Sequence, residues 1–328
     1  MIDKIADNRV YRSYLGGSRI DEFITGVPGT DGSYPEDWLA STVEAFNPGH
    51  EVPGEGLGRT VDGTLIRDLM PQGLPILVKL LDAAQRLVIQ VHPTRTFARE
   101  RMQSPVGKTE SWYILKASPE ACVYIGFRPD ITRQAWEECF ETQDIPRMLG
   151  YLHRFPVKEG DCIFVPGGVP HAIGGGCLMI ETQEPSDLMV IPERMTPAGL
   201  KLADSKLHGG LGFDHMMDCF AYEGLTEQEA RQRFFAKPRQ LDDCCACLLD
   251  GQDNGLFSVM RLSVQGDYQR AFDSSAGIAV VLSGSGTLEL DGQTVSVAAP
   301  DRVLLRELNK GKLHVHGESL EIVLALPV

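Results

Sequence analysis

The sequence lacks any run of eighteen apolar residues, so no helix long enough to span a membrane is expected. Its first residues, MIDKIADNRVYRSYLGG, lack the apolar core of a secretory signal peptide, and we therefore expect a cytoplasmic protein. Positive charge is also scarce, because 31 Lys and Arg stand against 45 Asp and Glu, for a formal net charge of −14. Binding to nucleic acid or to an anionic membrane depends on Lys and Arg, so neither kind of partner is expected. A small phosphorylated substrate needs only a few local cations and is compatible with this charge.

A second Cys-x-x-Cys pair is also missing. The eight cysteines are scattered, and without a signal peptide they indicate reduced thiols. Cys244 and Cys247 form a single pair, whereas a structural zinc site needs four ligands, so we expect buried small apolar side chains there. The pair His314 and His316 lies on one strand face, but no carboxylate or third histidine follows at ligand spacing.

Hydrophobic patterning is mostly that of β-strands. Short apolar or alternating runs occur in residues 74–93, 110–115, 121–127, 156–191 and 255–328. Between residues 131 and 155 the apolar positions recur at three- and four-residue spacing, which predicts one or two inserted helices. Residues 225–235 form a further predicted helix with Thr226 as its N-cap. Asp291–Gly292 between TLEL and TVSV predicts a hairpin turn.

This pattern predicts a mainly β protein of two packed β-sandwich units, with the small helical insertion in or beside the first. We place the first, catalytic unit at residues 1–240 and a C-terminal β unit at residues 241–328. The second unit is expected to be structural, because it lacks a ligand set. The runs at 110–115 and 121–127 are expected to pair as a hairpin, and 196–213 to form a loop.

Two segments carry most of the chemistry. Residues 90–115 read QVHPTRTFARERMQSPVGKTESWYIL, and residues 160–176 read GDCIFVPGGVPHAIGGG. Gln90 and His92 are two residues apart, so on a strand both side chains leave the same face. In the second segment, glycine and proline bend the backbone before a strand that begins with His171. The segments together offer N and O donors suited to one divalent metal ion: Gln90, His92, Glu110 and His171.

The spacing Gly160-x5-Pro166-x-Gly168-x2-His171 matches the second motif of the cupin superfamily up to its histidine. Short sequence segments around this motif narrow the resemblance to one family within the superfamily. They are PILVKLLDA (75–83), IQVHP (89–93), GKTESWY (107–113), VPGGVPHAI (165–173) and IETQEPSD (180–187). In this order they resemble the type I mannose-6-phosphate isomerases. The resemblance runs clearly from about residue 35 to residue 187, and it is weaker toward both ends of the chain.

The resemblance implies that both β-sandwich units are cupin-type jelly rolls. It also implies an aldose–ketose isomerase that interconverts mannose 6-phosphate and fructose 6-phosphate and that needs one divalent metal ion, usually Zn²⁺. The metal would be held by the four donors already named, Gln90, His92, Glu110 and His171. The partner would be a small-molecule sugar phosphate, with no nucleic acid and no membrane, and the protein would be a monomer or a homodimer.

The resemblance further implies roles for three charged residues. Lys79 of LVK and Lys108 of GKTE match substrate-site lysines of the family, and Glu181 of IETQEPSD matches an acid of the same site. Lys108 and Glu181 are thereby candidate catalytic residues. Lys108 also lies two residues before Glu110, so it shares a strand face with that predicted ligand.

One position departs from the family pattern. Relatives carry an arginine, held to be catalytic, four residues after the SD pair, whereas SDLMVIPER places Ile191 there. The nearest arginine is Arg194, which would replace it as a catalytic residue if the chain bends at Pro192. Otherwise the site lacks that cation, and the substrate or the rate differs.

Aldose–ketose interconversion moves a proton between C1 and C2 through a cis-enediol. It requires a positioned base and positive charge where the enediolate oxygens develop. A bound metal with an open position is one source of that charge. Glu181, Lys108 and a metal-bound water all stay candidates for the base. Two alternative functions also stay open: a cupin isomerase or epimerase for a different sugar or sugar phosphate, and a non-catalytic sugar-binding cupin.

Overall fold

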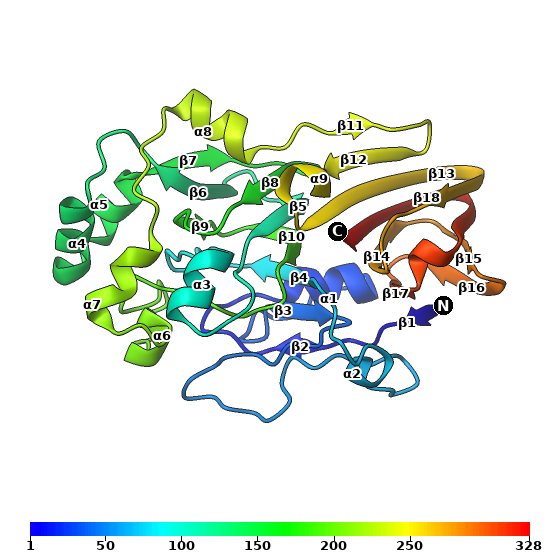
Figure 1. Cartoon of the computed structure of the whole chain (residues 1–328), viewed down its shortest axis with the longest axis horizontal. Coiled ribbons are helices and arrows are strands. Elements are labelled where there is room, and N and C mark those ends of the chain that lie inside the picture. Colours follow the sequence, from blue (N-terminus) through cyan, green and yellow to red (C-terminus); the bar gives the residue numbers. More distant parts are fainter.

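Three antiparallel sheets organise the chain in the computed structural model, which describes all 328 residues (Figure 1). The fold is mainly β, as the sequence predicts. The six-stranded sheet has the order β2 (Arg9–Val10), β3 (Glu36–Leu39), β4 (Leu77–Ala83), β10 (Cys177–Gln183), β5 (Glu110–Ala117) and β8 (Cys162–Val165). The three-stranded sheet has the order β7 (Leu152–Pro156), β6 (Cys122–Phe127) and β9 (His171–Ile173).

A nine-stranded sheet forms the other end of the molecule. Its main path is β1 (Ile2–Lys4), β17 (Arg302–Arg306), β14 (Ala276–Ser283), β18 (Lys312–Pro327), β13 (Phe257–Ala271), β12 (Cys245–Leu249) and β11 (Arg239–Gln240). The hairpin of β15 (Ser285–Leu290) and β16 (Gln293–Ala298) adds to β18. Its turn is the predicted Asp291–Gly292, with φ of 50° and 77°, the left-handed pair that suits the twist of a hairpin.

Helices are short and lie at the margins of the sheets. They are α1 (Ser18–Thr25), α2 (Ile66–Leu69), α3 (Arg95–Arg101), α4 (Arg133–Thr142), α5 (Ile145–Gly150), α6 (Asp204–His208), α7 (Phe213–Met216), α8 (Glu227–Phe234) and α9 (Gly251–Asn254). The predicted helical insertion is confirmed as α4 and α5, although its last residues form β7. Thr226 caps α8 through a reciprocal capping box with Glu229, also as predicted. None of the helices is long and apolar enough to cross a bilayer.

Two local predictions were wrong. The runs at 110–115 and 121–127 do not pair with each other, because β5 lies in the six-stranded sheet and β6 in the three-stranded one. Their apolar side chains, among them Trp112 and Val123, instead share one hydrophobic cluster, so the two strands face each other across a core. Within 196–213, expected to be a loop, residues 204–208 form α6.

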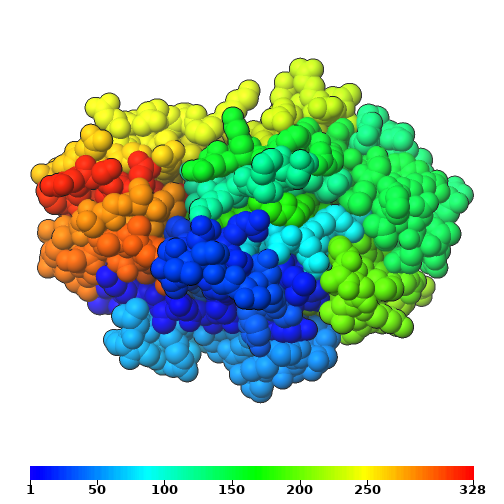
Figure 2. All heavy atoms as spheres, turned by 180° about the vertical axis from the view of Figure 1, so that it is seen from behind, coloured from blue at the N-terminus to red at the C-terminus, as the bar shows by residue number.

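The N- and C-terminal parts of the chain share a core. One apolar cluster combines Leu80 and Ile180 of the six-stranded sheet with Leu304 and Val323 of the nine-stranded sheet. The first strand also crosses the predicted boundary at residue 240, since β1 pairs with β17. From behind, the dark blue N-terminal residues lie against the orange strands of the C-terminal sheet (Figure 2). The division into units at residue 240 stays a prediction.

Candidate active site

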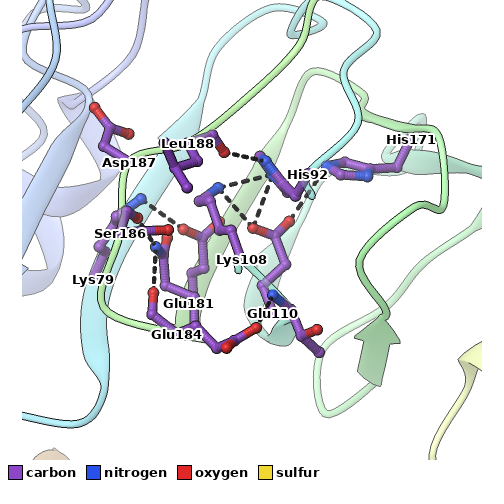
Figure 3. A network of polar contacts seen from close by, with 12 residues as sticks. Lys79, His92, Lys108, Glu110, His171, Glu181, Glu184, Ser186, Asp187 and Leu188 are labelled. Atoms are coloured by element: carbon purple, nitrogen blue, oxygen red, sulfur yellow. Dashed lines mark hydrogen bonds and ion pairs between the residues drawn. The ribbon is translucent and has the colours of Figure 1, made fainter. Parts of the chain in front are cut away.

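Three of the predicted metal ligands converge in the interior. Glu110 begins β5, His171 begins β9, and His92 lies between β4 and α3. His92 Nε2 is 3.2 Å from Glu110 Oε2, and His171 Nε2 is 3.4 Å from Glu110 Oε1. Their potential ligand atoms all lie within 4.8 Å of one another, and all three residues are buried (Figure 3). The fourth predicted ligand, Gln90, pairs with His171 through two backbone hydrogen bonds of 2.9 Å, so the two side chains leave the same face.

Close backbone contacts hold the two motif loops against the His92 segment. Gly168 N donates to His92 O at 2.7 Å, and Lys108 N donates to Pro93 O at 3.0 Å. Such an approach needs glycine, because a Cβ on Gly167 would lie 2.8 Å from Pro93 O and one on Gly107 would lie 2.5 Å from it. The glycines in both motifs therefore permit the close packing of the loops that positions the predicted ligands.

The histidines are oriented by their backbone contacts. His92 Nδ1 lies 2.9 Å from Leu188 O, and His171 Nδ1 lies 2.9 Å from Val169 O. A carbonyl oxygen only accepts, so Nδ1 carries the proton in each ring and the Nε2 lone pair faces Glu110. Burial lowers the pKa of both rings, that of His171 to about 3, which keeps them neutral at physiological pH.

The donor set fits a divalent metal ion. Glu110 Oε1 and His171 Nε2 are buried and have no hydrogen-bond partner within the protein. Such orphaned polar atoms are costly unless another group satisfies them. Although burial opposes ionisation, the Lys108 ammonium holds the pKa of Glu110 well below its ordinary value, so the carboxylate is ionised. Two neutral imidazoles and a carboxylate are ligands that zinc accepts.

Lys108 lies beside the same cluster. Its Nζ is 2.8 Å from Glu110 Oε2 and 2.8 Å from His92 Nε2. The segment after β10 holds this loop in place, since Thr109 N donates to Glu184 Oε2 at 2.9 Å and Ser186 Oγ donates to Gly107 O at 2.6 Å (Figure 3). The structure thus brings Lys108 to the predicted metal ligands.

A second charged group lies on β3, β4 and β10. Lys79 and Glu181 are directly opposite in the β4–β10 ladder, and Lys79 Nζ donates to Glu181 Oε1 at 2.7 Å (Figure 3). Lys79 Nζ also lies 3.5 Å from Glu36 Oε2 and 5.0 Å from the centre of the Trp38 ring. Burial raises the pKa of Glu181, although Lys79 opposes the shift. The predicted substrate lysine and the predicted acid are therefore one buried ion pair.

The two groups border one cavity. Residues with polar or charged side chains in its wall are Arg12, Ser13, Tyr14, Glu36, Lys79, Gln90, Lys108, Glu181, Thr196 and Lys206. Ile191 lines the wall as well, so the position that carries an arginine in relatives faces the cavity with an apolar side chain. The predicted substrate residues Lys79, Lys108 and Glu181 thus line one cavity. Of the predicted metal ligands Gln90 lines it too, whereas His92 and Glu110 lie behind Lys108, which contacts both.

Arg194 is not brought to this cavity. Its guanidinium lies over the rings of Phe140 at 4.6 Å and Phe213 at 5.3 Å, and its backbone N donates to Gln143 Oε1. Between Ile191 and Thr196, which both line the cavity, the chain contacts Gln143 of the helical insertion, and Arg194 lies on that side. Its predicted catalytic role has no geometric support.

Two cavity cations were missed by sequence reasoning. Arg12 forms a bidentate pair with Asp187 at 2.8 and 2.9 Å and also donates to Glu36 Oε1 at 3.1 Å. A signal for it exists, since Arg12 is two residues before Tyr14, the first residue of YLGG, so in an extended chain both side chains leave the same face. Lys206 lies in α6, within a segment without clear periodicity, and no sequence pattern indicates it.

Fold and site together define a mainly β protein with a buried His–Glu–His cluster beside a charged cavity. No family model matches the chain. Mannose-6-phosphate isomerase ManA of Bacillus subtilis is 38% identical over 121 residues, which cover 34% of this chain and 35% of ManA. The mannose-6-phosphate isomerase of Streptococcus mutans is 37% identical over 113 residues, 34% of each chain. The protein YvyI of B. subtilis, provisionally named for the same activity, is 29% identical over 238 residues, 70% of this chain and 68% of its own.

Solved structures extend the comparison over the whole fold. The B. subtilis mannose 6-phosphate isomerase structure has a TM-score of 0.74 at 22% identity, covering 98% of this chain and 99% of its own. Phosphomannose isomerase from Salmonella typhimurium reaches 0.72 at 14% identity and 99% coverage of both chains. The resemblance to type I mannose-6-phosphate isomerases predicted from the motifs is confirmed in sequence and in fold. The alignments to ManA and to the S. mutans enzyme nevertheless span only about a third of those relatives' length.

Proposed function

We propose that this protein is a metal-dependent aldose–ketose isomerase that interconverts mannose 6-phosphate and fructose 6-phosphate in the cytoplasm, as a monomer or homodimer. The observation that carries the proposal is the buried His92–Glu110–His171 cluster beside Lys108 and a cavity lined by the Lys79–Glu181 pair. The names of the relatives agree with this activity.

The metal is proposed to be one divalent ion, with Zn²⁺ favoured by the nitrogen and oxygen donors. Gln90, His92, Glu110 and His171 would hold it. When bound, such an ion supplies Lewis-acid stabilisation of the oxygens on C1 and C2. The remaining chemistry belongs to the side chains of the cavity.

Glu181 is the proposed base. Interconversion through a cis-enediol requires one group to take a proton from one carbon and return it to the other. The raised pKa of Glu181 brings the carboxyl nearer to the range in which it can both accept and release a proton, and Lys79 fixes its position. Lys108 contributes positive charge for the developing enediolate oxygens.

One observation favours a second candidate function. Ile191 faces the cavity where relatives carry an arginine, and Arg194 lies elsewhere. A changed wall can admit a different sugar or sugar phosphate with the same proton transfer. An isomerase or epimerase of that specificity is therefore the alternative proposal.

An activity assay on metal-reconstituted protein tests both the proposed function and the alternative. The protein is stripped with a chelator, dialysed, and assayed for fructose 6-phosphate formation before and after Zn²⁺ addition. Stripping should abolish turnover, Zn²⁺ should restore it, and His171→Ala should stay inactive while remaining folded. Full turnover in metal-free protein would contradict the proposal. A higher kcat/KM for another sugar phosphate or for free mannose would favour the alternative.

A further inference from the structure

Lys206 occupies the junction between two hollows. It lies in α6 (Asp204–His208), is buried, and lines the wall of the main cavity. An adjoining outer hollow includes Tyr11, Asn47 and His50 in its wall, and the two hollows share Lys206 and Ser13. Lys79, Lys108 and Glu181 border the main cavity and not the outer hollow, so Lys206 marks the end of the main cavity toward the outer hollow.

Lys206 differs from the other cavity cations in its partners. Arg12 pairs with Asp187 at 2.8 Å, Lys79 with Glu181 at 2.7 Å and Lys108 with Glu110 at 2.8 Å. Lys206 forms no ion pair, and its only hydrogen bond is a long one of 3.3 Å from Nζ to the neutral Asn47 Oδ1. A buried cation without a counter-ion is unfavourable, so this position favours an incoming anion.

Ser13 adds a second donor at the same place. Its hydroxyl forms no hydrogen bond within the protein, although it borders both hollows next to Lys206. An ammonium and a free hydroxyl at one junction suit a phosphate group, whose oxygens accept several charge-assisted hydrogen bonds.

We infer that Lys206 binds the phosphate of the sugar phosphate at the junction of the two hollows. The inference rests on the proposed function. Lys206 then determines the choice of a phosphorylated over a free sugar, and it orients the substrate with C1 and C2 toward Glu181 and Lys108. The cation is supplied by α6, whereas position 191 carries isoleucine.

The charge state of Lys206 gives a pH signature. Burial and then the charge of Arg12 lower its pKa to about 8, while Asp187, Glu36 and Glu55 raise it. As pH rises through about 8, Lys206 loses its proton before substrate binds, and its attraction for phosphate falls. KM for the sugar phosphate should therefore rise above pH 8, and it should stay flat there in Lys206→Arg because arginine remains charged.

Kinetics of matched variants test the role. In the zinc-loaded protein, Lys206→Met should raise KM for mannose 6-phosphate by about 10- to 100-fold, the range of one charged hydrogen bond. kcat should change by less than about threefold, and Lys206→Arg should recover most of the KM. The exposed Lys158, in the β7–β8 loop far from the cavity lining, gives the control Lys158→Met. A fall in kcat with unchanged KM would overturn the inference.

A binding measurement separates this inference from the isomerase proposal. Sorbitol 6-phosphate lacks the reacting carbonyl, and calorimetry would compare it with sorbitol. Wild type should prefer the phosphate, and Lys206→Met should lose that preference. The inference would be overturned if wild type and Lys206→Met bound sorbitol 6-phosphate with equal affinity. It would also be overturned if the preference for the phosphate were lost in Lys201→Met, a change in the outer hollow, and kept in Lys206→Met. Lys206-dependent binding without turnover of any sugar phosphate would support it while refuting the isomerase.

Discussion

Glu36 shows how single residues support the site. Its carboxylate accepts from Tyr14 Oη at 2.7 Å, Trp38 Nε1 at 2.7 Å and Arg12 Nε at 3.1 Å, and it lies 3.5 Å from Lys79 Nζ. Burial opposes ionisation, but Arg12 and Lys79 outweigh it and lower the pKa of Glu36 to about 2. The carboxylate thereby positions both the Lys79 ammonium and the Arg12 guanidinium.

Glu36→Gln should destabilise the protein by about 3 kcal/mol at pH 7, because two buried cations lose a shared carboxylate. The pKa of Glu36 is lower in the folded chain than its ordinary 4.5, so its contribution is present above pH 4.5 and is lost as pH falls toward 2. The difference in unfolding free energy between wild type and variant should shrink over that window. Denaturant titrations at pH 7, 4.5 and 3 measure it, with the exposed Glu318→Gln as control; a difference independent of pH would contradict the assignment.

The positions of site residues were predictable where local spacing determines them, and their roles stay predictions. Gln90, His92, Glu110 and His171 lie in two short motifs whose strand alternation already places their side chains. Arg12 and Lys206 reach the cavity only through the packing of distant segments, which local pattern does not encode. The position of Arg194 was not predictable for the same reason, since the path of the chain after Pro192 depends on contacts with α4, and its catalytic role stays a prediction.

Among the elements, the turn between β8 and β9 determines where His171 lies relative to His92. Gly167 lies in this turn, and a Cβ there would come within 2.8 Å of both Pro93 O and Thr94 Cα. Both atoms belong to backbone that cannot rotate away. The turn can place His171 next to His92 only while position 167 has no side chain.

Gly167→Ala should therefore weaken metal binding by about 10- to 100-fold, although every ligand is retained. Chelator competition would measure the affinity, and circular dichroism would confirm the fold. Gly150→Ala in α5 is the matched control, because a Cβ there meets nothing within 4 Å. If Gly167→Ala bound metal as tightly as wild type, the prediction would be contradicted, because the β8–β9 turn could then move away from Pro93 and Thr94 without disturbing the metal site.

Elements were predictable where their signals are local. The Asp291–Gly292 turn and the Thr226 cap depend on neighbouring residues, and both were found. The partners of β5 and β6 depend on which apolar faces meet in the folded core. Two apolar runs joined by a short connection have the same sequence pattern whether they pair as a hairpin or lie in two sheets that face each other across a core.

At the scale of the whole molecule, the shared core predicts cooperative unfolding. Leu304 is fully buried and packs in the cluster that also contains residues of the six-stranded sheet. Arg302 adds a buried polar link, since its Nη1 lies 3.1 Å from Asp37 Oδ2. Residues 1–240 and 241–328 should therefore stabilise each other strongly.

Leu304→Ala should lower the unfolding free energy by about 2 to 5 kcal/mol, the cost of a large-to-small change in a core. The three tryptophans, Trp38, Trp112 and Trp136, all lie in the N-terminal part, so fluorescence reports on residues 1–240 and far-ultraviolet circular dichroism on the whole chain. The unfolding midpoints given by fluorescence and by circular dichroism should coincide and should shift together to a lower denaturant concentration. Separate transitions would show that the two parts unfold independently.

The pairing of β1 with β17 also orders events in time. Ile2 lies opposite Leu305, so the partner strand leaves the ribosome some three hundred residues after β1. At roughly 5 to 20 residues per second, that delay is about 15 to 60 s. The strands that enclose the cavity are all synthesised within this interval, while the backbone groups of β1 still lack their partner. The first strand to be synthesised is thus among the last to pair with its neighbour in the sheet.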